Sequence, residues 1–409
     1  MSSNRRGFLQ SLVALPGVGG VLGGLLPASL VAKPSKRDVF MKRDVYKELG
    51  IRPLINAAGT YTVLSASLIP REAVDAIESA SRQYVNLIEL QEAVGKKIAA
   101  LIGSEAALVS AGAASALTLG TAACVAGKDQ EKIRRLPDTT GMKNEVIIQK
   151  SHRYGYDHAI RNVGIKFVEV ETPAELESAA NERTAMMMFL NENNNKGQIK
   201  DQEFAQLGKK LNVPTFIDAA ADCPPVENLT KFLKLGFSLV TFSGGKGLRG
   251  PQCSGLLLGR QDLIEAALLN NNPYSDSVAR TNKVGKEELV GMWVALEHFL
   301  KQDHQAVWRD WEKRCKTIAD LVTPAQRSVK TEVFVPEIAN AVPHLRITWD
   351  FTATGLSPHD VVKQLRDGEP RIEVRPGAKE AIEVAVSMLE PGEEQIVGRR
   401  LREILKKAA

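Results

Sequence analysis

The segment Leu239-Val-Thr-Phe-Ser-Gly-Gly-Lys-Gly-Leu-Arg-Gly-Pro-Gln252 decides the architecture of this 409-residue chain. It runs from a short apolar stretch into a glycine-rich loop that holds Lys246. Glycine permits backbone conformations that other residues resist and lets a ligand approach closely. A lysine removed from water has a lowered pKa and can form a Schiff base with a carbonyl. Because most glycine-flanked lysines are solvated loop residues, the segment indicates a ligand site only together with the sequence upstream.

An acid ends the strand-like stretch Thr215-Phe-Ile-Asp218, which precedes this segment. The interval between Asp218 and Lys246 leaves room for one helix and one strand. A carboxylate at the end of a buried strand is costly unless it meets a cation. The protonated pyridine nitrogen of pyridoxal 5'-phosphate (PLP) is such a cation, and PLP needs that charge to accept electrons. The alternative role for Asp218 is a helix N-cap, a position that aspartate favours.

A run of small residues, Ser110-Ala-Gly-Ala-Ala-Ser115, precedes a long apolar stretch over residues 116–126. A small-residue loop that opens a helix presents free N–H groups and the positive end of the helix dipole, which suits a phosphate group. The alternative is ordinary helix capping by Ser110. Together with Asp218 and Lys246, the run favours a phosphate site.

Helical and strand-like patterns alternate from about Arg71 onward. This rhythm predicts an α/β fold with a mostly parallel sheet between helices. Ligands in such sheets bind beyond the carboxyl ends of the strands, where Asp218 and Ser243 are expected. A long helical stretch from Gly285 to about Leu321 leads to a small C-terminal α+β domain. The expected helices cover residues 71–84, 89–102 and 393–407, and the expected strands lie at Val146, Phe167, Met186, Thr215, Leu239, Gly255, 345–349 and 371–374.

The chain order of phosphate loop, ring-stacking residue, aspartate and lysine resembles that of fold-type I, aspartate aminotransferase-like PLP enzymes. The closer resemblance is to the selenocysteine synthase-like group. That group includes L-seryl-tRNA(Sec) selenium transferase and the D-glucosaminate-6-phosphate ammonia-lyase-like enzymes. The matching stretches are Ile55-Asn-Ala-Ala-Gly-Thr60, Ser110–Ser115, Phe216-Ile-Asp-Ala-Ala220, Phe242-Ser-Gly-Gly-Lys246, Gly250-Pro-Gln252 and Lys283-Val-Gly-Lys-Glu-Glu288.

The resemblance implies a role for several residues around the cofactor. Lys246 carries the internal aldimine, and Asp218 pairs with the pyridine nitrogen. For the flat partner of the cofactor ring, the family position favours His152, which follows the strand at Val146, while Tyr154 and Tyr156 stay open as alternatives. The residues expected to hold the phosphate are Ser110, Gly112, Ala113, Ala114 and Ser243.

The same resemblance predicts an enzyme that acts on a small amino acid or amino sugar acid, most often by α,β-elimination. Transamination shares its first steps, and selenium transfer on seryl-tRNA is a further alternative. A non-catalytic exported scaffold would keep the fold alone, but the intact Lys246 and Asp218 count against it. Candidates for holding a substrate anion are Arg249, Gln252, Arg346 and Arg371, although each arginine could instead be a surface ion-pair residue.

The N-terminus, with Asn4-Arg-Arg-Gly-Phe-Leu9 before an uncharged stretch to Ala32, resembles a twin-arginine signal. We therefore expect export to the periplasm. The stretch is rich in glycine and broken by Pro16, which makes a stable membrane span unfavourable. The expected division of the chain is a signal (1–32), an N-terminal arm (33–65), a large PLP-binding domain (66–290), and a bridging helix with a small C-terminal domain (291–409).

Composition excludes some other classes of protein. A formal net charge of +5, without a basic block that contains aromatic residues, does not favour nucleic-acid binding. The four cysteines (Cys124, Cys223, Cys253, Cys315) have no metal-binding spacing, so no metal site is expected. Cys223 and Cys253 are predicted to be buried small hydrophobic residues.

The resemblance also predicts the oligomeric state. Fold-type I sites usually borrow residues from a second subunit, which implies a homodimer or a larger homo-oligomer.

Overall fold

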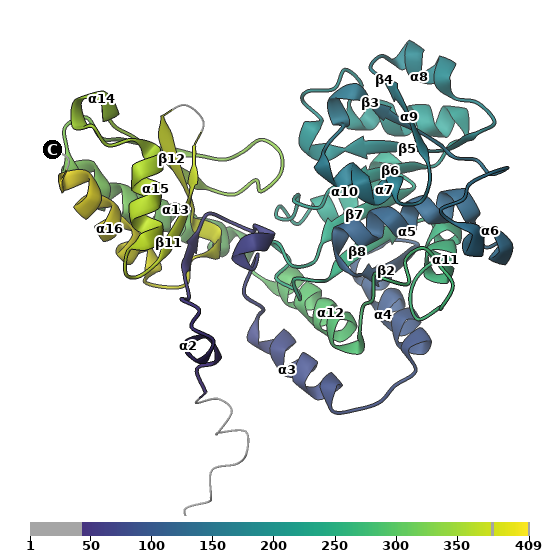
Figure 1. Cartoon of the computed structure of the whole chain (residues 1–409), viewed down its shortest axis with the longest axis horizontal. Coiled ribbons are helices and arrows are strands. Elements are labelled where there is room, and N and C mark those ends of the chain that lie inside the picture. The colour runs from purple at the N-terminus through teal and green to yellow at the C-terminus, as the bar shows by residue number, and fades with distance from the viewer. Residues whose placement is uncertain (1–42, 378–379, 408–409) are drawn as a thin grey trace, which may run out of the picture. The chain divides into compact units, whose positions relative to one another are not determined.

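The computed structural model describes residues 43–377 and 380–407 (Figure 1). The chain divides into two compact units, Met1–Pro53 and Leu54–Ala409. The described part of the first unit contains the short helix α2 (Val45–Glu48), where Asp44 caps the N-terminus by accepting from the backbone N–H of Lys47. The expected signal (1–32) and the beginning of the expected arm lie outside the described residues.

A seven-stranded sheet lies at the centre of the second unit, in the order β2-β8-β7-β6-β5-β3-β4. The neighbours from β4 to β7 pair in parallel, whereas β8 runs antiparallel to both β7 and β2. The predicted mostly parallel sheet is therefore confirmed. The strands are β2 (Ala106–Ser110), β3 (Glu145–Gln149), β4 (Lys166–Val170), β5 (Thr184–Leu190), β6 (Thr215–Asp218), β7 (Leu239–Ser243) and β8 (Gly255–Gly259).

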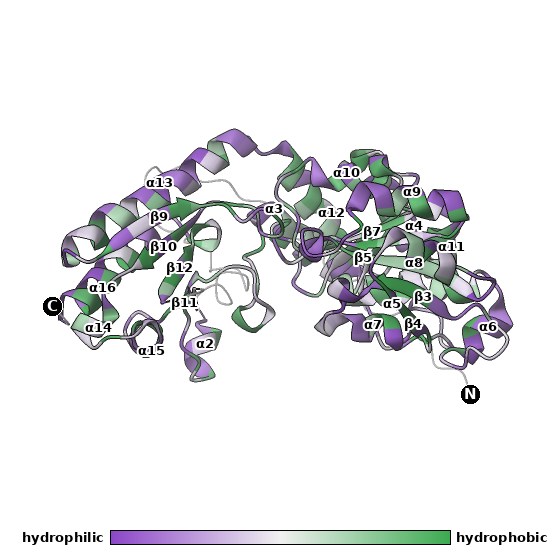
Figure 2. Ribbon diagram, turned by 90° about the horizontal axis from the view of Figure 1, so that it is seen from above, coloured by the Kyte–Doolittle hydropathy of each residue, from purple (hydrophilic) through white to green (hydrophobic). Residues whose placement is uncertain are grey.

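The inner strands of this sheet are apolar on both sides because helices cover both faces. Strand β5 is buried along its whole length. Its side chains alternate between two cores, with Met187 and Phe189 in one and Met186 and Met188 in the other. Figure 2 shows the hydrophobic character of β3 in the same sheet. Continuous apolar runs of this kind are typical of parallel strands buried on both faces.

The helices around the sheet contribute to these two cores. Helices α4, α9, α10 and α12 supply buried residues to one core, and α5, α6, α7 and α11 supply them to the other. Helix α5 lies so close to the sheet that a Cβ on Gly120 would come within 2.4 Å of the Phe216 ring. The helix bounds are α3 (Arg71–Ser81), α4 (Leu87–Ile102), α5 (Gly112–Ala126), α6 (Gln130–Arg135), α7 (His158–Arg161), α8 (Pro173–Ala179), α9 (Asp201–Leu211), α10 (Asn228–Leu235), α11 (Gln261–Leu269) and α12 (Lys286–Lys301).

A five-stranded sheet in the order β1-β11-β12-β10-β9 forms the small C-terminal domain. Its edge strand β1 comes from the beginning of the second unit and pairs in parallel with β11, so that Ile55 lies opposite Ile372. Residues 55–57, expected in the arm, are thus part of the C-terminal sheet. The elements are β1 (Ile55–Ala57), β9 (Lys330–Phe334), β10 (His344–Thr348), β11 (Ile372–Pro376), β12 (Ala381–Ala385), α13 (His304–Val322), α14 (Phe351–Thr354), α15 (Pro358–Asp367) and α16 (Glu393–Lys407).

The long helical stretch predicted from Gly285 to about Leu321 is two helices. Helix α12 ends at Lys301, and α13 begins at His304. Between them, Asp303 caps α13 by accepting a hydrogen bond of 2.9 Å from the backbone N–H of Ala306. Aspartate favours this N-cap position, and the extended backbone of Gln302 ends the preceding helix. The prediction of one continuous bridging helix was therefore wrong at this junction.

Short 3₁₀ helices connect several of these elements. Three of them, η1, η3 and η4, place residues beside the cavity described below. Those in the described part of the chain are η1 (Thr62–Leu64), η2 (Lys150–His152), η3 (Gly155–Asp157), η4 (Asn191–Asn193), η5 (Thr323–Ala325) and η6 (Val386–Met388).

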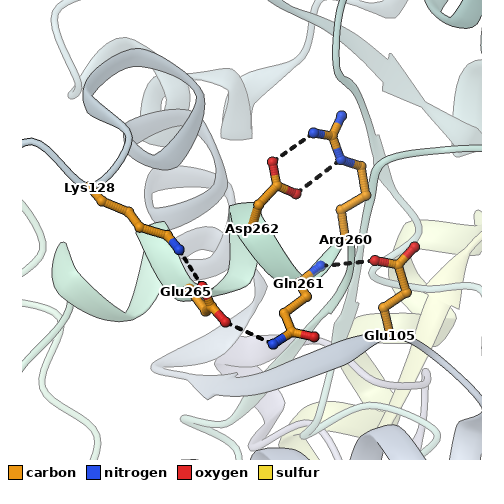
Figure 3. A network of polar contacts seen from close by, with 6 residues as sticks. All are labelled: Glu105, Lys128, Arg260, Gln261, Asp262 and Glu265. Atoms are coloured by element: carbon orange, nitrogen blue, oxygen red, sulfur yellow. Dashed lines mark hydrogen bonds and ion pairs between the residues drawn. The ribbon is translucent and has the colours of Figure 1, made fainter.

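A polar network joins the beginning of α11 to neighbouring elements on the surface (Figure 3). Arg260 donates to Asp262 at 2.6 Å, and the backbone N–H of Gln261 donates to Glu105 at 3.1 Å. Glu265 accepts from Lys128 and, at 2.8 Å, from the side chain of Gln261. Exposed ion pairs of this kind contribute at most about 1 kcal/mol each. The network therefore supplements the apolar contacts of α11 with α5 and does not replace them.

Candidate active site

The loop that carries Lys246 is held in place by backbone hydrogen bonds. The N–H of Gly244 donates to the carbonyl of Ser254 at 2.9 Å, and the N–H of Gly250 donates to the carbonyl of Gly244 at 2.7 Å. A Cβ on Gly245 would come within 2.5 Å of the Gln252 Cα. Glycine is therefore required where the loop folds back on itself, and the amine of Lys246 projects from a closed turn.

Asp218 lies at the carboxyl end of β6 and is only 5% exposed. Its Oδ1 accepts a hydrogen bond of 2.9 Å from the backbone N–H of Ala220, and its Oδ2 accepts one of 2.5 Å from the hydroxyl of Tyr154. Burial raises the pKa of the carboxyl, while these two donors and the charge of Lys246 act in the opposite direction. A buried carboxylate in this position gains stability when a cationic group lies beside it.

The N-terminus of α5 supplies the third part of the site. Gly112 opens the helix with φ of 81°, and no side chain caps the free N–H groups of the first turn. Ser115 in that turn has a buried hydroxyl without a hydrogen-bond partner among the described residues. Free N–H groups and the positive end of a helix dipole favour an anion.

These three features meet at one cavity of about 200 Å³. The cavity brings together the predicted residues Lys246, Asp218 and Ser243, the phosphate-loop residues of α5, and Gln252. The described residues that line it are Thr62, Gly112, Ala113, Ala114, Leu117, Tyr154, Tyr156, Leu190, Glu192, Asp218, Ala220, Ala221, Asp222, Ser243, Lys246, Gln252 and Ala339. Gln252 also donates at 2.8 Å to the carbonyl of Thr62, which fixes its side chain at the rim.

The donor set fits PLP. An anion-binding helix terminus suits the phosphate, a buried carboxylate suits the pyridine nitrogen, and a primary amine suits the aldehyde. A Cβ on Gly255 would come within 2.4 Å of the Gly112 carbonyl carbon, so the phosphate loop lies tightly against β8. Among the described residues, no group of three or more His, Cys, Asp and Glu side chains could hold a metal ion.

The Gly255→Ala substitution tests this fit. The added methyl group would push the backbone of Gly112 away from β8, and we expect PLP affinity to fall about 10-fold or more because phosphate contacts depend on that backbone. The measurement is a titration of apoprotein with PLP, followed by visible absorbance. The unfolding temperature serves as the control for general destabilisation. A folded variant with parental PLP affinity would contradict the placement of the phosphate.

His152 does not line the cavity, although the sequence favoured it as the ring-stacking residue. It is fully buried, its Nδ1 accepts from the backbone N–H of Leu190 at 3.2 Å, and its ring packs edge-on against Phe189 at 4.4 Å. The alternatives Tyr154 and Tyr156 both line the cavity. The side chains of both tyrosines reach the cavity because the chain turns through η3 after β3. The number of residues between a strand and a side chain does not reveal such a turn.

Ser110 lies near the cavity, but its hydroxyl does not line it. The hydroxyl donates at 2.9 Å to the carbonyl of Gly112 and stabilises the loop from behind. The structure therefore supports a role for Ser110 in shaping the phosphate loop, with Gly112, Ala113 and Ala114 facing the cavity.

The three candidate arginines also lie away from this cavity. Arg346 pairs with Glu332 at 2.8 Å and Glu383 at 3.2 Å, and Arg371 pairs with Glu373 at 2.7 Å. They are ion-pair residues of the small domain. This is the alternative to substrate binding that the sequence analysis left open. Arg249 donates at 2.9 Å to the carbonyl of Ser387 and lines a second cavity.

Several cavity residues were not singled out from the sequence. Thr62 and Ala339 reach the cavity from segments near the small domain, and Glu192 reaches it from η4. No local pattern marks these three. Asp222 lies four residues after Asp218. A second acid so close to the end of a strand is a sequence signal that predicts a cavity residue.

The cysteine predictions had different outcomes. Cys223 is buried at 6% exposure, as predicted, whereas Cys253 is exposed. Cys253 lies in the connection between the Lys246 loop and β8, where its side chain turns outward. All four cysteines are free thiols. Within the described residues, no helix has the length and apolar character needed to cross a bilayer.

Burial of His152 predicts a pH-dependent stability. Burial lowers the pKa of its imidazole from 6.5 to about 4, so between these values the unfolded chain binds a proton that the folded protein does not. The free energy of unfolding should therefore be highest above about pH 6.5. It should decrease towards pH 4 by up to about 3 kcal/mol. The measurement is urea unfolding across this range for the parent and His152→Gln. The expected difference is a smaller loss in the variant, and parallel pH profiles would exclude His152 as the source.

Comparison with known proteins gives three consistent matches. A family model described as SelA, L-seryl-tRNA selenium transferase, matches residues 54–308. The D-glucosaminate-6-phosphate ammonia lyase of Salmonella typhimurium (strain 14028s / SGSC 2262) is 30% identical over 385 residues, covering 90% of this chain and 100% of that protein. The 5'-C-glycyluridine monooxygenase-decarboxylase of a Streptomyces species is 32% identical over 377 residues, covering 88% and 92%.

A solved structure of D-glucosaminate-6-phosphate ammonia-lyase is similar over nearly the whole fold. The TM-score is 0.78 at 28% sequence identity, and the match covers 90% of this chain and 100% of that one. Sequence and structure comparisons therefore agree.

Proposed function

Since the chain belongs to the SelA (L-seryl-tRNA selenium transferase) family, we propose that it is an ammonia lyase for a β-hydroxy amino acid or amino sugar acid. It has the fold of fold-type I PLP-dependent enzymes, and its cofactor is PLP. The observation that carries the proposal is that Lys246, Asp218 and the N-terminus of α5 line the same cavity. Such a cavity offers one base, one counter-charge and one phosphate site.

Each of these residues has a part in the proposed elimination. PLP, when bound, accepts electrons from bonds to the carbon that bears the amino group. Asp218 would stabilise a positive charge at the ring nitrogen of the bound cofactor. The amine of Lys246 takes the proton from the α-carbon, and the free N–H groups of α5 would hold the phosphate. Gln252 and Thr62 lie at the cavity, where they are placed to orient the substrate.

The direct test is a substrate screen with the purified holoprotein. The panel contains β-hydroxy amino acids of both configurations and amino sugar acids with and without a phosphate group. The expected result is release of keto acid and ammonia in equal amounts. Amino transfer to an added keto acid without ammonia release would instead identify an aminotransferase.

Three other observations would identify different functions. Oxygen consumption coupled to decarboxylation would favour the second candidate function, which the similarity to the Streptomyces monooxygenase-decarboxylase supports. Binding of seryl-tRNA at moderate salt would favour selenium transfer, for which the modest net charge of +5 offers little support. A protein that takes up no PLP would be the non-catalytic scaffold.

We also propose that residues 1–32 are a twin-arginine signal that directs the enzyme to the periplasm. Support comes from Arg5 and Arg6 before the uncharged stretch, and a cofactor enzyme loaded in the cytoplasm suits a pathway that carries folded proteins. The test compares cell fractions of the parent and an Arg5→Lys, Arg6→Lys variant. The variant is expected to stay in the cytoplasm, and periplasmic accumulation of it would exclude this route.

The enzyme is further proposed to be a homodimer or a larger homo-oligomer. Several large apolar side chains around the α3–α4 connection and η1 are exposed, including Tyr84, Val85, Val63 and Leu68. Burying such side chains between copies would remove apolar area from water. Sedimentation analysis should show more than one chain per particle, and a monomer at micromolar concentration would contradict the proposal.

A further inference from the structure

Asp222 is a second acid in the cavity that the reaction described so far does not use. It follows β6 by four residues, is 4% exposed, and lines the cavity together with Lys246. Its Oδ1 accepts a hydrogen bond of 3.1 Å from the backbone N–H of Ala339. The side chain of Asn191 also interacts with the carboxyl. Asp222 is therefore fixed at the wall of the cavity.

No ion pair among the described residues includes Asp222, although the carboxyl is buried. The charged groups that face it are Lys246, which favours its ionised form, and Asp218, which opposes it. Burial has the largest effect and raises the pKa of Asp222 to about 6. A carboxyl of this kind can carry and release a proton near neutral pH.

Elimination of a hydroxyl group needs such a proton donor, because hydroxide is a poor leaving group. Lys246 is occupied with the α-proton, and Asp218 belongs to the ring nitrogen. The hydroxyl of Tyr154 donates a hydrogen bond to Asp218, and burial raises the pKa of this phenol far above its usual value, so it is a poor acid. Glu192, the remaining acid of the cavity, is exposed to solvent.

We propose that Asp222 is the general acid that protonates the departing hydroxyl group, an inference that rests on the proposed lyase function. Lys246 Nζ takes the α-proton, and the electron pair of that bond forms the Cα–Cβ double bond. The Cβ–O bond breaks with its electron pair on oxygen, and the proton of Asp222 completes a water molecule. The released enamine then takes up water and gives keto acid and ammonia, while Lys246 gives up its proton to solvent and Asp222 regains one from it.

The test uses two leaving groups in the holoenzyme. D-glucosaminate 6-phosphate loses hydroxide and needs an acid, whereas β-chloroalanine loses chloride and does not. In the Asp222→Asn variant, turnover of the hydroxy substrate should fall about 100-fold or more, and turnover of β-chloroalanine less than about 3-fold. Exchange of the α-proton with deuterated water, followed by NMR, should stay at the parental rate.

A matched variant, Glu192→Gln, removes a negative charge from the same cavity. It should change the turnover of both substrates by the same factor. Asparagine at position 222 can still accept the hydrogen bond from Ala339, so the variant separates proton donation from the structural contact. An equal loss with both substrates, or no loss with either, would overturn the proposal.

A second readout does not depend on turnover. The infrared difference spectrum between the parent and Asp222→Asn holoenzymes should show a protonated carboxyl that disappears as the pH rises from about 5 to about 8. A carboxyl that is already ionised at the lower pH would also overturn the proposal. If the parent eliminates neither hydroxide nor chloride, the lyase function itself has failed, and the infrared result still reports the protonation of Asp222.

Discussion

Replacement of Lys246 by alanine should abolish turnover and leave the fold intact. The proposed reaction needs the amine of this side chain both to link the cofactor and to take the α-proton. A positioned base alone contributes about 10²–10⁴-fold, so the combined loss should exceed about 10⁴-fold. The fold should survive because the turn is formed by backbone hydrogen bonds of Gly244 and Gly250 and does not need the lysine side chain.

Single-turnover assays and unfolding temperatures of the Lys246→Ala protein provide the measurement. Borohydride treatment of the parent should fix PLP on Lys246, and peptide mapping should find no label in the variant. Lys210→Ala is a suitable control because Lys210 lies on the surface, where it pairs with Glu177. The control should keep parental activity. Parental activity in Lys246→Ala would rule out the proposed mechanism.

Asp218→Ala should give the second largest effect. The cofactor would lose the charge partner of its ring nitrogen, and the hydroxyl of Tyr154 would lose its acceptor. We expect a weaker hold on PLP and a catalytic loss of about 10³-fold or more, which corresponds to about 4 kcal/mol of barrier. Asp218→Asn keeps the shape and removes the charge, so a similar loss in that variant would assign the effect to charge.

The measurements for Asp218 are PLP titration by visible absorbance and the turnover rate at saturating PLP. Separating the two distinguishes weak cofactor binding from slow chemistry. Tyr154→Phe is the matched control, because it removes the hydrogen bond of 2.5 Å and keeps the carboxylate. Its effect should be clearly smaller than that of Asp218→Asn. Full activity of Asp218→Asn would place the counter-charge elsewhere.

The large domain could be predicted from sequence because its strands are short apolar runs that are followed by polar residues or glycine. Strands β3 to β8 all lie where the sequence indicated. Strand β2 was not predicted, since Ala106–Ser110 is composed of small residues continuous with the apolar helix α5. Helix α4 was predicted to begin at residue 89, but it begins at Leu87, directly after its N-cap Asn86.

The site could be predicted where a residue lies at or just after the end of a strand, or where it opens a helix. Asp218 ends β6, Lys246 follows β7 and Gly112 begins α5, and all three line the cavity. The expected position of His152 rested on the same rule, but η2 and η3 turn the chain after β3 and bring the two tyrosines to the cavity. Arg346 and Arg371 were named by analogy with fold-type I enzymes, whereas in the structure they pair with Glu383 and Glu373.

The pairing of β1 with β11 has a consequence for biosynthesis. On the ribosome, residues 55–57 leave the exit tunnel long before their partner at residues 372–374 exists. The C-terminal sheet can therefore be completed only after translation of nearly the entire chain, and the early strand must wait with its edge unpaired. A fragment that begins at residue 291 would lack this edge strand, and nascent chains that stop early would be natural clients for chaperones.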